Sequence, residues 1–222
     1  MIDFGYIETK DNLYSRIEAN SKFGSFDLHE WVEKKFIIKQ GAKALDLGCG
    51  DGSMLLHFQK IKQIRGLGIE INADNIQKCL EKGVNVIEHN IDKGLGAISN
   101  NSFDIVLMSH TIQTLKNPLL ALEEITRIGK KCIVTVPNFG YWKIRTSLLF
   151  KGKMPLTTNL PEDWYNSENI HLCTLKDFEN LCRELKITIE EKFVINSRGQ
   201  ARKHLSLGSN LFSSSGVYKI FK

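Results

Sequence analysis

The chain has 222 residues, of which 42% are hydrophobic and 25% charged, an ordinary balance that allows a sizeable core. This length suggests one large domain or one domain with decorations. The net charge of +5 is mild. The densest basic stretch consists of Arg198, Arg202, Lys203 and His204. We expect it to be a solvated loop, and so we expect no nucleic-acid partner.

The cysteines argue against a disulfide framework and against a zinc site, because they are widely spaced and form no CxxC pair. They are Cys49, Cys79, Cys132, Cys173 and Cys182. No metal is therefore expected. The residues from Met1 to Gly5 contain no apolar signal region, and no run of about 20 apolar residues occurs anywhere. We therefore expect no membrane partner and a reducing cytoplasmic location.

Two parts follow one another along the chain. Residues 1–40 predict an N-terminal helical segment, because Leu28, Trp31, Val32 and Phe36 recur at helical spacing. Residues 41–222 predict one domain, which an aromatic and proline-containing insertion at 138–173 interrupts. An insertion of this length favours a functional role.

From residue 43 onward, short apolar strands alternate with helices. The expected strands are 43–47, 65–70, 84–88, 103–108, 132–136, 187–195 and 216–221, and the expected helices are 54–60, 72–82, 117–128 and 175–185. Asn72 and Thr174 are expected helix N-caps. The alternation predicts a Rossmann-like α/β fold with a seven-stranded, mainly parallel sheet and helices on both faces. The last two strands could pair antiparallel.

The first strand ends in the turn Asp46-Leu47-Gly48-Cys49-Gly50-Asp51-Gly52. Three glycines at this spacing allow a sharp turn and the close approach of a ligand. The two carboxylates would repel a pyrophosphate, whereas S-adenosylmethionine (AdoMet) carries a sulfonium and an ammonium. The turn therefore predicts AdoMet as cofactor and S-adenosylhomocysteine as product, with a nicotinamide or flavin dinucleotide as the alternative.

The ends of the next strands supply further cofactor contacts, because ligands of open α/β sheets bind outside the carboxyl ends of the strands. Glu70 is placed to accept hydrogen bonds from the two ribose hydroxyls. Ile71 would lie against the adenine ring. Asn90 would contact the adenine amino group, and Asp92 is the competing choice for that contact. The assigned cofactor-binding residues are Asp46, Gly48, Cys49, Gly50, Gly52, Glu70, Ile71, Asn90, Ile91, Ser109 and His110.

A methyl acceptor is expected beneath the insertion, although no recognisable acid–base pair stands there and the catalytic residue is unknown. Methyl transfer from a sulfonium depends mostly on positioning and desolvation, so a general base is needed only for an acceptor that must lose a proton. The tentative acceptor pocket consists of Asn138, Tyr141, Trp142, Tyr165 and His171, with Arg145 and Trp164 as further candidates.

The insertion resembles that of the methionine-biosynthesis family MetW. The resemblance rests on Pro137 to Trp142, Gly152 to Pro155, Leu160-Pro161, Trp164-Tyr165, Asn169 to Thr174, Asp177 to Glu179 and Leu181 to Leu185. The glycine turn, Gly68 to Ile71 and Gly83 to Ile87 agree as well, so the resemblance covers roughly residues 41–195. Two features depart from the family pattern: Asn90 stands where an Asp is expected, and the segment before residue 40 is longer.

The resemblance implies the class I methyltransferase fold and a role in methionine synthesis beside homoserine O-acyltransferase (MetX). Two functions of different classes follow. The first is an enzyme that methylates a small molecule or a protein. The second is a non-catalytic AdoMet-binding subunit that associates with the acyltransferase and regulates it.

Overall fold

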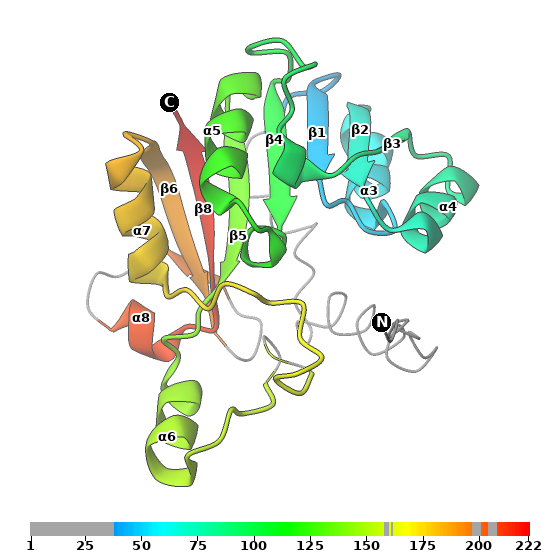
Figure 1. The fold of residues 1–222 in the computed structure, drawn as a ribbon. Helices are drawn as coiled ribbons and strands as arrows, with labels where there is room; N and C mark the ends of the chain where they lie inside the picture. The colour runs from blue at the N-terminus through cyan, green and yellow to red at the C-terminus, as the bar shows by residue number, and fades with distance from the viewer. Residues whose placement is uncertain (1–37, 158–159, 161, 197–200, 204–207) are drawn as a thin grey trace.

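The structure is a computed structural model that describes residues 38–157, 160, 162–196, 201–203 and 208–222 (Figure 1). The predicted N-terminal helical segment, apart from its last three residues, lies outside the described residues. The boundary between that segment and the domain therefore stays a prediction. Within the described residues, no helix combines the length and the apolarity that crossing a membrane requires.

The described strands form one eight-stranded sheet with the order β3-β2-β1-β4-β5-β8-β6-β7. Strands β1 to β5 pair in parallel, whereas β8 pairs antiparallel with both β5 and β6. The predicted Rossmann-like, mainly parallel fold is confirmed. The strands are β1 (Lys43–Leu47), β2 (Arg65–Glu70), β3 (Val86–Glu88), β4 (Ile105–Ser109), β5 (Cys132–Pro137), β6 (Thr188–Ile195), β7 (Ala201–Lys203) and β8 (Ser215–Phe221).

Local capping chemistry sets the helix boundaries near the predicted positions. The Asn72 side chain accepts a hydrogen bond from the N–H of Asn75, and Thr174 forms a capping box with Asp177. The helices are α3 (Ser53–Lys62), α4 (Ala73–Glu81), α5 (Pro118–Ile128), α6 (Trp142–Lys151), α7 (Leu175–Glu184) and α8 (Ser209–Phe212), with 3-10 turns η1 (Ile91–Lys93) and η2 (Ile112–Thr114).

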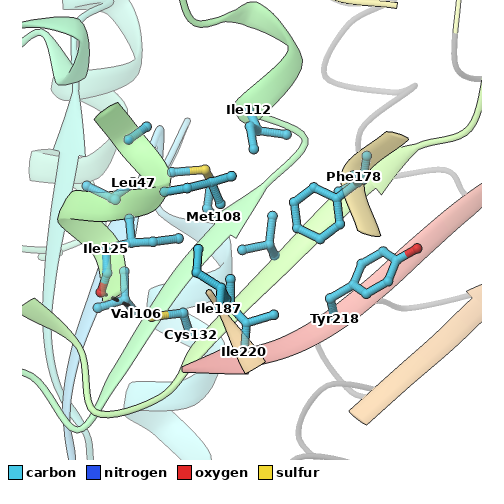
Figure 2. Close-up of a cluster of buried hydrophobic side chains, with 14 of the residues drawn as sticks. Leu47, Val106, Met108, Ile112, Ile125, Cys132, Phe178, Ile187, Tyr218 and Ile220 are labelled. Carbon is cyan, nitrogen blue, oxygen red and sulfur yellow. Dashed lines mark hydrogen bonds between the residues drawn. The ribbon is translucent and has the colours of Figure 1, made fainter. Parts of the chain in front are cut away.

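Two hydrophobic clusters cover the two faces of the sheet. One cluster joins the sheet to α5 and α7 (Figure 2), and the other joins it to α3 and α4. In the first, the rings of Phe178 and Tyr218 lie 4.7 Å apart between centroids. The Tyr218 hydroxyl donates to Glu179, which also forms an ion pair with Lys192. This polar attachment anchors α7 beside the antiparallel end of the sheet.

The structure departs from the sequence predictions at two places. Arg202 and Lys203 belong to β7, which pairs with β6, so the sheet has one strand more than the seven predicted and this basic stretch is not wholly a loop. The insertion contains α6, which the sequence analysis did not predict. One side chain of α6, Ile144, is buried, so the helix lacks the apolar periodicity by which buried helices are recognised.

The central role of α5 in the first cluster gives a prediction about stability. Leu122 is completely buried, whereas Leu119 on the same helix is half exposed. Leu122→Ala should lower the free energy of unfolding by about 2–5 kcal/mol, because it leaves a cavity in a packed core. Urea denaturation measures this change, and Leu119→Ala is the control. A loss below about 1 kcal/mol for Leu122→Ala would contradict the packing described.

Candidate functional site

The three glycines of the turn after β1 serve different purposes, although all have positive φ. A Cβ on Gly48 would lie 2.6 Å from Oγ1 of Thr111, and one on Gly52 would lie 2.9 Å from Sγ of Cys79. These two glycines therefore permit close packing inside the protein. A Cβ on Gly50 would meet no protein atom within 4 Å. Gly50 is thus the glycine whose outer face is open to a ligand.

The carboxylate of Glu70 at the end of β2 holds this turn against its neighbouring strand. Oε2 accepts a hydrogen bond from the N–H of Gly50 at 2.8 Å, and Oε1 accepts from Ile71 and Asn72 at 2.8 and 3.0 Å. A carboxylate offers about four acceptor positions, and three are used here. About one acceptor position therefore remains for a ligand hydroxyl, and the contact of Glu70 with the two ribose hydroxyls stays a prediction.

Asp46 is a second buried acid beneath the turn, with 2% of its surface exposed. Burial and then the nearby charge of Glu70 raise the pKa of Asp46 to about 7. Both effects disfavour its negative charge, and a cation bound nearby would favour it. The region below Gly50 is therefore suited to a positively charged group.

Asp51 does not add to this negative charge as the sequence analysis assumed. Its carboxylate pairs with Lys82 and accepts hydrogen bonds from the hydroxyl and the N–H of Ser53. Partial burial opposes ionisation, but the bonds from Lys82 and Ser53 outweigh it and hold the pKa of Asp51 below its usual value. Asp51 therefore accepts the first N–H of α3, and N–H groups at the start of a helix are the groups that a phosphate would need.

The ends of β2 and β3 offer an apolar surface and a polar loop. Ile71 is 60% exposed directly after Glu70, which suits it to contact with a flat ring. The Asn90 side chain accepts from the N–H of Asp92, while Asp92 accepts from the N–H of Asn117 at the start of α5. Asp92 therefore braces α5, which leaves Asn90 as the better candidate of the two. Ile91 is buried between them.

The turn after β4 is fixed by several hydrogen bonds. Thr111 donates to the carbonyls of Leu47 and Ser109, and the side chain of Gln113 donates to the carbonyl of His110. His110 has a φ of 51°, which is uncommon for a residue with a side chain. Burial lowers the pKa of His110 to about 4, so its imidazole is neutral at pH 7 and a weak base.

Asn138 is a structural brace. Its Nδ2 donates to the carbonyls of Asn210 and Ser213, and its Oδ1 accepts from the N–H groups of Gly140 and Leu175. The side chain is completely buried and its donors and acceptors have these partners. Its assignment to the acceptor pocket is therefore corrected: Asn138 joins the start of the insertion to α7 and to the segment before β8.

The other proposed acceptor contacts are spread over different environments. Tyr141 is buried in a small cluster with Phe139, Ile144 and Leu160. Trp142 and Tyr165 are exposed on the surface. The N–H of His171, like that of Ile170, donates to the carbonyl of Gln113 at 3.0 Å. The backbone of His171 is thus joined to η2, the turn after β4, while its side chain is exposed.

Side chains that support the site from behind were not predicted in that role, although Thr111 was expected with Ser109 and His110 beside the methionine part of the cofactor. The Thr111 hydroxyl joins the turn after β4 to the end of β1, and Lys82 pairs with Asp51 in the glycine turn. The Gln113 side chain braces the turn after β4, and its backbone carbonyl accepts the N–H groups of two residues of the insertion. Thr111 and Gln113 follow a strand end, the location at which polar residues of this fold class gather, so that position was the available signal. Lys82 lies at the end of a helix, and no sequence signal indicated its role.

The family model for "Methionine biosynthesis protein MetW" matches residues 28–220. The chain belongs to the MetW family. A bifunctional methionine biosynthesis protein MetXA/MetW from Rhodopirellula baltica is 30% identical over 165 residues, which is 70% of this chain. The match spans 26% of that longer relative.

A second curated relative is the ubiquinone/menaquinone biosynthesis C-methyltransferase UbiE of Bdellovibrio bacteriovorus. It is 28% identical over 151 residues, which cover 58% of this MetW-family chain and 64% of the relative. The match thus spans less than two thirds of either curated relative.

Solved structures show the fold. A SAM-dependent methyltransferase from Thermotoga maritima has a TM-score of 0.66 at 18% identity, with 96% of each chain covered. The [4+2]-cyclase SpnF has a TM-score of 0.63 at 15% identity, with 88% of this chain and 80% of that chain covered. The MetW-family chain therefore has the class I methyltransferase fold. The cyclase shows that this fold also supports other chemistry.

The open face of Gly50 gives a prediction about ligand binding. Gly50→Ala should weaken AdoMet affinity by at least about tenfold, because the new methyl group would occupy the ligand's position. Isothermal titration calorimetry measures the affinity. Gly41→Ala is a matched control, because Gly41 also has positive φ and open space around its Cβ position but lies before β1, at the opposite end of that strand from the turn. Equal affinity in both variants would place the ligand elsewhere.

Proposed function

We propose that this MetW-family chain is an AdoMet-dependent methyltransferase with a role in methionine biosynthesis. The observation that carries the proposal is Gly50, the open glycine of a turn that Glu70 holds and below which Asp46 is buried. This arrangement offers a close backbone approach to a ligand that carries both hydroxyl groups and positive charge. AdoMet combines these features.

The residues around the turn divide the ligand among them. Glu70 would accept one ribose hydroxyl, Ile71 would cover the adenine face, and Asn90 with Ile91 would meet the adenine edge. Asp46 would favour the cationic methionine part, beside Ser109 and His110. AdoMet would supply an already activated methyl group, so these residues act by orienting it and by excluding water.

The acceptor is expected to need little help with proton transfer. His110 is neutral and weakly basic, and Asn138 and Tyr141 are committed to bracing the insertion. This favours an acceptor atom that is already nucleophilic at neutral pH. His171 is the side chain we propose as an acceptor contact, because its backbone is held beside the end of β4. A cytoplasmic location stays a prediction.

Incubation with methyl-labelled AdoMet and extract from the organism that encodes the chain tests the enzymatic proposal. We expect label in a small-molecule or protein fraction, and its absence with Gly50→Ala as the control. The same preparation should bind AdoMet by calorimetry. Binding without any labelled product would contradict the enzymatic proposal and leave the cofactor proposal standing.

Asp46 gives a prediction about pH. Its folded-state pKa of about 7 lies above the ordinary value of 3.8, so its own contribution favours the folded protein at low pH and weakens as the pH rises through 7. A bound cation favours the ionised form. AdoMet affinity should therefore fall by about tenfold from pH 7.5 to 5.5.

Calorimetry at both pH values measures this change, and Asp46→Asn is the control, which should bind weakly with little dependence on pH. An affinity of the unaltered protein that is the same at both pH values would exclude a charge contact with Asp46.

A second function is supported by the bifunctional relative, whose name joins MetXA and MetW in one polypeptide. We propose as the alternative that the chain is an AdoMet-binding subunit of homoserine O-acyltransferase (MetX). The acyltransferase activity, measured with this chain and with or without AdoMet, tests it. A change in rate that requires both chain and AdoMet supports regulation, and an unchanged rate excludes it.

A further inference from the structure

The insertion carries most of the exposed apolar side chains of the described part of the chain. Ten of the sixteen large apolar side chains that are exposed lie within residues 138–173, about a sixth of the sequence. Six of them form a group on α6 and the loop that follows it. We call this group the α6 surface; it consists of Trp142, Leu148, Leu149, Phe150, Met154 and Leu156.

The α6 surface is built to remain outside the core. Ile144 packs inward with Phe139, Tyr141 and Leu160, which fixes the inner side of α6. Leu149 and Phe150, by contrast, are 75% and 80% exposed. Figure 1 shows α6 extending away from the sheet, beyond α8. Apolar clusters of this kind on a protein surface mark interaction sites.

The surface also has a fixed shape. The hydroxyl of Ser147 donates to the carbonyl of Lys153 at 3.1 Å, which ties the loop after α6 back to the helix. The guanidinium of Arg145 donates to the carbonyl of Gly140, which ties the helix to the segment before it. Helix and loop are therefore held together by side-chain hydrogen bonds, and binding would order few additional groups.

The charge around this face is of one sign. Lys143, Arg145, Lys151 and Lys153 lie in or beside α6, and no Asp or Glu occurs between Cys132 and Pro161. This segment thus carries four positive charges, against a net charge of +5 for the whole chain. Two copies of the chain joined through α6 would bring like charges together, which disfavours a second copy as the occupant.

We infer that the α6 surface is the docking site for a protein partner with an apolar groove edged by carboxylates, and that this partner is the MetX-type acyltransferase. The inference rests on the second proposed function, because the bifunctional relative places a MetXA part and a MetW part on one polypeptide. An anionic membrane could also accept cations beside apolar side chains, but no other observation here points to a lipid surface.

The experiment measures the affinity of the full chain for the homoserine O-acyltransferase of the same organism by biolayer interferometry. Leu149→Ser/Phe150→Ser should weaken binding by at least about tenfold, because it removes the central apolar contacts. Leu80→Ser/Ile87→Ser is the matched control, because these exposed residues lie on α4 and β3, and it should bind as the unaltered chain does.

A second pair of variants tests the charge. Lys151→Glu/Lys153→Glu should weaken binding and reduce its dependence on salt, because the partner's carboxylates would then face like charge. Lys39→Glu/Lys60→Glu changes the same charge at exposed positions away from α6 and should have little effect. All variants should keep the AdoMet affinity of the unaltered chain, which shows that the cofactor site is intact.

The outcomes separate the two proposals. A complex that all variants form equally would overturn the assignment of the α6 surface as the docking site and leave the proposed partnership with the acyltransferase standing. No complex with the unaltered chain would overturn both. Binding of the unaltered chain to vesicles that contain phosphatidylglycerol, lost in Leu149→Ser/Phe150→Ser, would assign the surface to a membrane. Self-association lost in the same variant would assign it to a second copy.

Discussion

Three backbone N–H groups from two neighbouring strand ends converge on the carboxylate of Glu70. The loop after β1 must reverse direction to enter α3, and its peptide groups would otherwise lack partners in a buried place. One side chain at the end of β2 satisfies part of this need and sets the distance between the two loops. The open face of Gly50 exists because the turn is held from below by Glu70 and from behind by packing at Gly48 and Gly52.

Three acidic side chains lie in or beside the glycine turn, and their charges are stabilised in different ways. Asp46 and Glu70 lie close enough for the charge of Glu70 to raise the pKa of Asp46. Lys82 compensates the third acid, Asp51, on the far side of the turn. Asp51 is thus paired with a cation, whereas Glu70 accepts backbone N–H groups. This division favours a cationic ligand over a phosphate.

Short-range patterns in the sequence predicted the sheet, the helices on both faces and the caps at Asn72 and Thr174, because hydrophobic periodicity and capping act within a few residues. They also located the glycine turn and Glu70. The role of Asn138 could not be predicted, because its partners lie up to 75 residues away. Helix α6 was missed for a different reason: its exposed leucines and phenylalanine blur the pattern that distinguishes a buried face.

Asn138 also links the insertion to the order in which the chain is made. Its side chain binds the carbonyls of Asn210 and Ser213, and its own N–H donates to the carbonyl of Ser214. These partners lie within the last thirteen residues of the sequence. During synthesis on a ribosome, the base of the insertion can therefore be fixed only after residues 210–214 have been made. Until then, the apolar residues of α6 are exposed on an unanchored segment, at a stage when chaperones have access to them.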